Sequence, residues 1–346
     1  MISSRRSKAI GLFSGGLDSI LATKLVTEQG IEVVALHFRV PFAPPGRPSA
    51  EERLRRLAEM TGASLLSVDV GADYLTIVSA PRYECARGRA PCVDCLVHML
   101  TKAKELAREI RADFVFTGEV AGQRARSQNK RSLKLIEKAS GLGGRLVRPL
   151  SAKLLEPTIP ELTGLLRRER LLDIKGRGRR RQIRLAHEFG IIDYSPPTGG
   201  CLLTDKSFAV RVGDAVEHEE FVPEVIELLK VGRHFRLESG ARVVVGRNER
   251  ENARLEGLLR EGDTVCRPLE TVGPVVLLRS PARASADVEL AARICARYSD
   301  RSGTGPVQVS CDDKEFRVEP IADTELGAWR IRTEPDQPEQ NQGEES

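Results

Sequence analysis

The sequence lacks any run of about eighteen consecutive apolar residues, which is the length that a membrane-spanning helix needs. The segment Met1–Ser7 is basic and leads directly into a strand-like run, without the apolar stretch typical of a secretory signal peptide. These absences argue against a membrane protein and an exported one. We therefore expect a cytoplasmic protein with no membrane partner.

The sequence also lacks a cysteine pattern typical of a disulfide framework. It has seven cysteines, an odd number, and no export signal, which favours free thiols, metal ligands or redox chemistry. Four of the cysteines stand in no motif, and we expect them to be small buried apolar residues. They are Cys85, Cys266, Cys295 and Cys311.

The composition is that of an ordinary globular protein, with 346 residues, 40% hydrophobic and 30% charged. The pattern predicts a nucleotide-binding domain over residues 1–150 and a basic connecting segment over 151–206. A smaller α+β domain is predicted over 207–333. The tail over 334–346 holds acids but no bases and no large apolar side chain, which predicts disorder.

The first 120 residues alternate between strand and helix patterns. Strand-like runs occur at 9–13, 32–38, 64–70 and 113–120, and apolar residues at helical spacing follow Leu17, Ala50 and Leu96. This alternation predicts an α/β fold with a doubly wound parallel sheet. Ligands of such sheets bind beyond the carboxyl ends of the strands.

A glycine-rich turn, Ser14-Gly15-Gly16-Leu17-Asp18-Ser19, joins the first predicted strand to the first predicted helix. Such a turn presents unpaired backbone N–H groups at the positive end of the helix dipole, which makes an anion site. The turn lacks the lysine of a Walker loop, and its glycines do not follow the dinucleotide-binding order. We therefore predict a nucleotide site of a different kind.

Three other cysteines have chemically suggestive surroundings. Cys92 and Cys95 begin a predicted helix, whose N-terminus can lower a thiol pKa toward neutrality. Cys201 follows two glycines, which allow a substrate to approach its sulfur. No further residue stands at the spacing that would complete a structural zinc site, although His98 and Cys85 are near enough in sequence to remain candidate zinc ligands.

Positive charge is concentrated in one short segment. Nine basic and two acidic residues lie between Arg167 and Arg184, whereas the rest of the chain holds 45 basic and 47 acidic residues. Such a patch fits a polyanion or a solvated helix face. For RNA contact we single out four of these residues, Arg177, Arg179, Arg180 and Arg181.

The glycine-rich turn resembles the pyrophosphate loop (PP-loop) of the ATP pyrophosphatases, which cleave ATP to AMP and pyrophosphate. Further matches make residues 8–205 similar to tRNA thiolation enzymes of that superfamily, the 4-thiouridine synthetases and the 2-thiouridylases. The 4-thiouridine synthetases are matched by Thr117-Gly118-Glu119, Gly122-Gln123, Ser127-Gln128 and Arg148-Pro149-Leu150, and the 2-thiouridylases by Cys95 and Cys201.

The resemblance implies roles for individual residues. Ser14, Gly15, Gly16 and Ser19 would cradle the phosphates of ATP, and Asp18 would help to hold Mg²⁺ and take part in catalysis. Cys95 and Cys201 would be the catalytic residues that handle sulfur. The nucleotide site would be completed by Phe38, Thr117 and Gly118.

Two departures from these families shape the expectation. Cys92 adds a C-x-x-C, and this motif with Cys201 is similar to thiolation enzymes that hold a [4Fe–4S] cluster by three cysteines. The chain also lacks the N-terminal RNA-binding domain and the rhodanese-like domain of its relatives. The stretch 245–252 resembles the RNA-binding domain of ribosome quality-control factors and would supply RNA contact.

These observations predict an ATP-dependent tRNA sulfurtransferase that adenylates a uridine carbonyl and replaces its oxygen with sulfur. A persulfide on Cys201 resolved by Cys95 is the alternative to the cluster. The sequence leaves two candidate sulfur donors, a cysteine desulfurase and free sulfide. It contains no feature that indicates the oligomeric state. Two other functions compete: a PP-loop enzyme that adenylates another substrate, and a non-catalytic factor that binds ATP and RNA.

Overall fold

The structure is a computed structural model that describes residues 6–44, 50–71, 73–83, 89–194, 201–280, 284–303 and 305–332. The chain forms two compact units, Met1–Thr204 and Asp205–Ser346. No helix in the described ranges combines the length and the apolar character needed to cross a membrane. Cys85 and the predicted acidic tail lie outside the described residues.

The first unit is an α/β layer structure, as predicted. Its five strands form a parallel sheet in the order β3-β2-β1-β4-β5. Its strands and α-helices are β1 (Lys8–Leu12), α1 (Leu17–Thr27), β2 (Glu32–Arg39), α2 (Ala50–Met60), β3 (Ser64–Asp69), α3 (Tyr74–Ser79), α4 (Cys92–Glu109), β4 (Phe114–Phe116), α5 (Lys130–Ala139), β5 (Leu146–Val147), α6 (Ile159–Leu162) and α7 (Arg180–Glu188). Short 3₁₀ turns cover Ala152–Leu154, Arg168–Arg170 and Leu202–Thr204.

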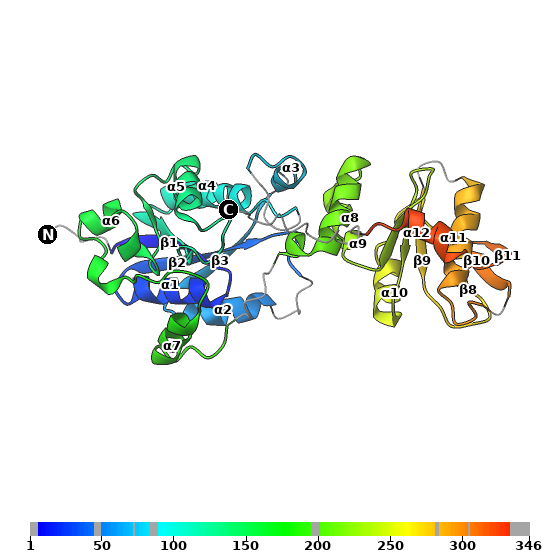
Figure 1. Cartoon of the computed structure of the whole chain (residues 1–346). Coiled ribbons are helices and arrows are strands. Elements are labelled where there is room, and N and C mark those ends of the chain that lie inside the picture. The colour runs from blue at the N-terminus through cyan, green and yellow to red at the C-terminus, as the bar shows by residue number, and fades with distance from the viewer. Residues whose placement is uncertain are drawn as a thin grey trace, which may run out of the picture. The chain divides into compact units, whose positions relative to one another are not determined.

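Helices cover both faces of this sheet, which confirms the doubly wound arrangement. Figure 1 shows α1, α2 and α7 on one side of the sheet and α4 and α5 on the other. The core on the α1 side includes Leu17, Ile20 and Leu21 of α1, with Ala9 of β1 and Phe114 of β4. Because α1 is buried along most of its length, the loop before it is held rigidly at the end of β1.

The stretch suggested as a connecting segment packs into the first unit. Leu166, Leu171, Ile174 and Ala186 are at most 2% exposed and belong to the same core as α1. Their apolar side chains are spaced irregularly among arginines and glycines, so no helical or strand period marked them as core residues. The chain crosses to the second unit only after Thr204.

The second unit is an antiparallel sheet with helices on both faces. Its sheet order is β11-β10-β8-β9-β7-β6. Its elements are α8 (Lys206–Glu217), α9 (Pro223–Leu229), β6 (Arg233–Arg236), β7 (Arg242–Val245), α10 (Glu249–Glu256), β8 (Thr264–Pro268), β9 (Val276–Arg279), α11 (Ser285–Arg297), β10 (Val307–Cys311), β11 (Lys314–Val318) and α12 (Asp323–Trp329). The predicted hairpin around Ser239-Gly240 and the predicted helices near 249 and 285 are therefore present.

Alternating residues of β7 feed two separate cores. Val243 and Val245 pack with α11 and α12, whereas Val244 packs with α9 and α10. Successive side chains of a strand point to opposite faces, so a continuous apolar strand is buried on both sides. This sandwiching explains why a unit of modest size has two cores.

The cysteines of the second unit correct one expectation. Cys266 of β8 and Cys311 of β10 are directly opposite each other in the sheet and form a disulfide, although we expected unpaired thiols. The register of the two strands, which no sequence motif announces, brings them together. Both are buried as expected, and so is Cys295, where burial raises the thiol pKa to about 12.

A buried ionic network joins α8 to β6 and β7. Arg242 is fully buried and pairs with Asp214 and Glu220, and Arg236 pairs with the same two carboxylates. Burial, reinforced by the charge of Arg242, lowers the pKa of His234 well below its usual range, so this ring stays neutral. The charges of the network are thus compensated within the second unit.

We expect Arg242→Ala to destabilise the second unit by about 3 kcal/mol, because it breaks two ion pairs of a fully buried guanidinium and leaves Asp214 and Glu220 to share Arg236 alone. Trp329, the single tryptophan, packs on the core of this unit and reports its unfolding in urea. Arg267→Ala removes an exposed pair with Glu256 and should cost less than about 1 kcal/mol. Equal losses in the two variants would contradict a special role for the network.

Candidate functional site

The PP-loop lies between β1 and α1. Gly15 has φ +70°, a backbone conformation that favours glycine, and a Cβ there would meet Leu54 Cδ2 at 2.5 Å. Gly16 is the N-cap of α1 and makes no side-chain cap, so N–H groups of the first turn have no capping acceptor. With Ser14 exposed beside them, the loop has the features of an anion site.

The two serines of the loop differ in their surroundings. The Ser19 hydroxyl donates to the Gly16 carbonyl at 2.8 Å and also lies 3.3 Å from the Ser14 backbone nitrogen. Ser19 is 7% exposed, so its hydroxyl holds the shape of the loop. Ser14 is the serine that solvent, and hence a ligand, can reach.

Asp18 has one satisfied and one unsatisfied carboxylate oxygen. Its Oδ2 accepts a hydrogen bond from Gln123 Nε2 at 3.0 Å, whereas its buried Oδ1 has no hydrogen-bond partner. A buried carboxylate oxygen without a partner is costly unless a cation or a donor completes it. Its chemistry fits Mg²⁺, which prefers carboxylate oxygens.

The segment after β4 lies against the loop. A Cβ at Gly118 would stand 2.6 Å from the Ser19 nitrogen and 2.7 Å from the Asp18 carbonyl carbon, so the two backbones are in close contact. Thr117 is 2% exposed and donates its hydroxyl proton to Glu119. The segment after β4 and the PP-loop therefore meet at the ends of their strands.

Arg148 holds the segment after β4 in place. It is 4% exposed and donates to Glu119 at 3.1 Å, to Glu137 at 3.2 Å and to the Leu133 carbonyl at 2.9 Å. The residues of the Arg148-Pro149-Leu150 motif thus act structurally, by holding Glu119 in place. Phe38, which we expected at the nucleotide site, is 7% exposed and near the end of β2.

The three predicted cysteines influence one another electrostatically. Cys92 and Cys95 are one turn apart at the start of α4, and each raises the pKa of the Tyr74 hydroxyl, as does Cys201. Cys92 and Cys201 in turn raise the pKa of the Cys95 thiol. The Leu202 N–H beside Cys201 donates to the Phe42 carbonyl at 2.8 Å, and the Phe42 ring lies 6.0 Å from that of Tyr74, whose hydroxyl lies 3.0 Å from Cys95 Sγ. The regions of Cys95 and Cys201 are therefore linked through Phe42 and Tyr74, although they are more than 100 residues apart in sequence.

The predicted low thiol pKa at the helix start is wrong for Cys95. Burial raises the pKa of this thiol to about 12, and a hydrogen bond with Tyr74 only partly opposes the shift. Burial also raises the pKa of the Cys201 thiol. The Leu203 backbone N–H and the charge of Arg124 lower this pKa and so partly oppose the effect of burial. Desolvation of the thiolate outweighs the helix dipole at this site.

No group of three or more His, Cys, Asp or Glu side chains within the described ranges is arranged to hold a metal ion. Zinc at Cys92, Cys95 and His98 therefore has no support. His98 instead hydrogen-bonds the Val70 carbonyl through Nε2 at 2.9 Å.

The nucleotide and thiol regions are linked through two consecutive residues. Gln123 hydrogen-bonds Asp18 of the PP-loop, and the next residue, Arg124, is close enough to Cys201 to lower its thiol pKa. Gly122, with φ +77°, allows this turn. Gly122-Gln123 belongs to a motif that was recognised in the sequence, but neither Gln123 nor Arg124 was predicted to lie at the site.

The predicted RNA-binding arginines at the start of α7 are not equivalent. Arg177, Arg180 and Arg181 are exposed, and Arg181 pairs with Asp173 at 2.6 Å. Arg179 is half-buried, and its Nε has no hydrogen-bond partner. Arg177 and Arg180 are therefore the better candidates for contact with a large polyanion.

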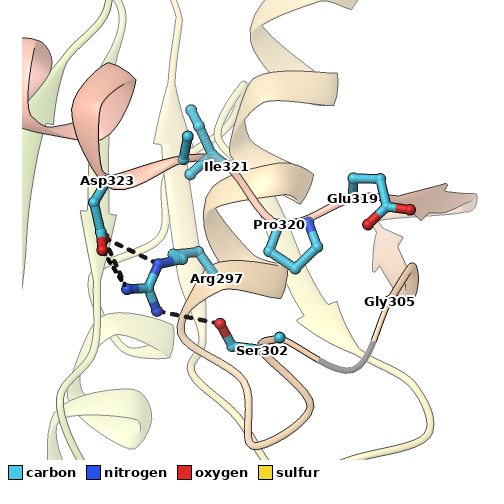
Figure 2. Close-up of a pocket in the computed structure, with 9 residues that line it drawn as sticks. Arg297, Ser302, Gly305, Glu319, Pro320, Ile321 and Asp323 are labelled. Atoms are coloured by element: carbon cyan, nitrogen blue, oxygen red, sulfur yellow. Dashed lines mark hydrogen bonds and ion pairs between the residues drawn. The ribbon is translucent and has the colours of Figure 1, made fainter.

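A surface hollow of about 520 Å³ lies in the second unit (Figure 2). Arg297 on its wall pairs with Asp323 at 2.8 Å and donates to Ser302 at 3.1 Å, so its charge is already compensated. The hollow is wide open, and nothing in its lining points to a ligand.

Each of the two units matches a known protein family. Residues 4–153 match the family described as thiamine biosynthesis protein (ThiI), and residues 232–330 match the NFACT protein RNA binding domain. The first unit is therefore similar to the ThiI family, and the second is similar to the NFACT RNA binding domain. The resemblance predicted from the motifs is confirmed.

Curated relatives match the chain over part of their length. A probable tRNA sulfurtransferase of Methanothermobacter thermautotrophicus is 34% identical over 124 residues, which are 34% of this chain and 30% of the relative. A tRNA-specific 2-thiouridylase of Sulfurimonas denitrificans is 31% identical over 109 residues, 30% of this chain and 32% of the relative. The chain thus spans about a third of the length of these relatives.

Two solved structures share partial similarity. A 4-thiouridine synthetase in complex with RNA and bound ATP has a TM-score of 0.39 and 21% identity, covering 65% of this chain and 52% of the other. The C-terminal part of a fibronectin/fibrinogen-binding protein from Streptococcus suis has a TM-score of 0.27 and 16% identity, covering 69% and 90%. Both TM-scores are too low to establish a shared fold.

We expect Gly118→Ala to weaken ATP binding about tenfold or more, because the added methyl group would displace the PP-loop backbone by overpacking. Equilibrium titration with ATP measures the effect. Gly143→Ala is the matched control, since nothing lies within 4 Å of a Cβ at that position. Unchanged affinity in the Gly118 variant would show that this close contact is irrelevant to the nucleotide.

Proposed function

We propose that the chain is an ATP-dependent tRNA sulfurtransferase, which activates a uridine carbonyl as an adenylate and replaces its oxygen with sulfur. The observation that carries the proposal is the link from Asp18 through Gln123 and Arg124 to Cys201. Gln123 contacts Asp18 beside the PP-loop, and the next residue, Arg124, acts electrostatically on Cys201. Activation and sulfur delivery both need such proximity.

The chemistry explains why the two sites belong together. A uracil carbonyl oxygen is a poor leaving group, so sulfur can replace it only after activation. Attack of that oxygen on the α-phosphorus of ATP releases pyrophosphate, and a sulfur nucleophile then displaces AMP. The backbone of Gly15 and Gly16 and the hydroxyl of Ser14 are placed to orient the phosphates, which is the main contribution of a protein to phosphoryl transfer.

Asp18 is the residue that would hold Mg²⁺. Its unpartnered Oδ1 is buried beside the loop, while Gln123 fixes its other oxygen. When bound, the ion would neutralise charge on the phosphates. Gln123 would orient the carboxylate.

Cys92, Cys95 and Cys201 would hold a [4Fe–4S] cluster. A four-iron cluster is wider than a single ion, so its ligands stand further apart than the ligands of zinc. Cysteine thiolates are the donors that such a cluster takes. A cluster with three cysteine ligands supplies one iron that is open to sulfide.

Persulfide chemistry is the competing route for the same residues. A persulfide on Cys201 resolved by Cys95 uses only these two thiols of the chain, and the charge of Arg124 favours negative charge on Cys201. The route also needs a cysteine desulfurase to supply sulfane sulfur and a reductant to reopen the Cys95–Cys201 disulfide that forms. It assigns no role to Cys92. We favour the cluster because it employs all three cysteines.

RNA contact would come from both units. The second unit is similar to the NFACT RNA binding domain, and the first exposes Arg177 and Arg180 at the start of α7. Phosphate neutralisation by arginine is independent of base sequence. These residues would therefore add affinity without choosing the uridine.

We expect Cys95→Ser and Cys201→Ser to lower tRNA thiolation at least about a hundredfold while leaving ATP binding unchanged, because both thiols handle sulfur rather than nucleotide. Mass spectrometry of tRNA nucleosides measures the product. Cys295→Ala, a buried thiol of the second unit, is the control. Anaerobically purified protein should be brown, and Cys92→Ala should be colourless.

The outcomes separate the competing functions. A colourless, iron-free and fully active preparation would contradict the cluster and support persulfide chemistry. Pyrophosphate release stimulated by tRNA supports thiolation, whereas stimulation by a small metabolite indicates an enzyme that adenylates another substrate. No stimulation by either indicates a non-catalytic factor that binds ATP and RNA.

We expect the double variant Arg177→Ala/Arg180→Ala to weaken tRNA binding, with a loss that shrinks as salt rises. The slope of log K against log salt should fall by about 0.7–0.9 for each phosphate contact removed. Arg108→Ala, an exposed arginine on α4 at the other face of the sheet, is the control. Identical slopes in wild type and the double variant would remove α7 from the RNA surface.

A further inference from the structure

Tyr74, the first residue of α3, contacts the thiol site although no motif surrounds it. It is 2% exposed, and its hydroxyl oxygen lies 3.0 Å from Cys95 Sγ. A buried tyrosine hydroxyl normally has a hydrogen-bond partner, and here that partner is a cysteine sulfur. The contact joins α3 to the first turn of α4.

The ring of Tyr74 is packed between the segments that carry the cysteines. Its centroid lies 6.0 Å from that of Phe42 and 5.8 Å from that of His98. The Phe42 carbonyl accepts the N–H of Leu202, the residue after Cys201, at 2.8 Å. Tyr74 therefore packs on Phe42, whose backbone binds the neighbour of Cys201, while its own hydroxyl contacts Cys95.

The direction of the hydrogen bond follows from the two groups. A thiol is a weak donor, whereas a phenol hydroxyl is a good one. Burial, reinforced by the neighbouring cysteines, raises the pKa of the Tyr74 hydroxyl, so it keeps its proton. The Tyr74 O–H is thus the donor and the Cys95 sulfur the acceptor.

We propose that Tyr74 is a positioning residue of the thiol site, whose hydroxyl aims the Cys95 sulfur and stabilises negative charge on it. The role of the Cys95 sulfur in tRNA thiolation rests on the proposed function. The hydrogen bond serves either chemistry, because a cluster ligand and a resolving thiol both carry negative charge on sulfur.

The effect is specific to one cysteine. Cys201 receives its own hydrogen bond from the Leu203 backbone N–H and the field of Arg124. Removing the Tyr74 hydroxyl should therefore change Cys95 and leave Cys201 as an internal reference in the same molecule.

The test is site-resolved alkylation of the reduced, metal-free full chain by iodoacetamide, with peptide mapping of Cys95 and Cys201. Tyr74→Phe keeps the ring between Phe42 and His98 and removes only the hydroxyl. Without the hydroxyl, the Cys95 sulfur loses its hydrogen bond and can leave its fixed orientation. We therefore expect the ratio of the Cys95 to the Cys201 alkylation rate to change at least about threefold.

Two further variants keep the test decisive. Tyr298→Phe removes a hydroxyl from a ring packed on Phe235 in the second unit and should leave the ratio unchanged. If Tyr74→Phe does not fold, replacement of the four tyrosines by 3-fluorotyrosine keeps every ring and changes the strength of the hydroxyl donor, so the same ratio should change. An unchanged ratio, or equal changes at both cysteines, would overturn the proposal.

A second measurement connects the residue to the reaction. With ATP and tRNA, Tyr74→Phe should lower thiolation while ATP affinity stays at the wild-type value, since Tyr74 makes no contact with the PP-loop among its described contacts. Because alkylation requires neither ATP nor tRNA, it tests Tyr74 even if the protein proves not to be a sulfurtransferase. Loss of ATP binding in this variant would count against a role confined to the thiols.

Discussion

The close approach of the backbone at Gly118 to the PP-loop is the constraint on which the rest of the site depends. Only a residue without a Cβ lets the chain after β4 touch Asp18 and Ser19. This contact starts the loop that runs through Gln123 and Arg124 toward Cys201. The proposed function uses this contact, since the end of β4 and the PP-loop meet without a side chain between them.

Buried ion pairs hold both units in the arrangement that their sites need. In the first unit Arg148 fixes Glu119 beside the PP-loop, and in the second Arg242 joins α8 to β7 through Asp214 and Glu220. Such pairs add little net stability compared with apolar packing, but breaking one leaves an uncompensated charge. They therefore specify geometry more than they stabilise the fold.

The fold was largely predictable, because its signals are local. The helix at Leu17–Thr27 begins where apolar spacing indicated, and the helix at Ala50–Met60 matches the charged helix that was predicted there. Buried strands such as Glu32–Arg39 read as apolar runs. The region 151–194 was not predictable as core, because its apolar residues follow no single period. Likewise, the Cys266–Cys311 disulfide depends on the register of β8 against β10 rather than on any local pattern.

The amino-acid sequence by itself determined the PP-loop, the parallel sheet and the identity of the three cysteines, since each depends on neighbouring residues whose spacing is visible along the chain. Tertiary structure alone decided that Tyr74 contacts Cys95, that Arg124 lies near Cys201 and that burial raises the thiol pKa. Desolvation and contact between distant segments are properties of the folded interior, and no motif encodes them.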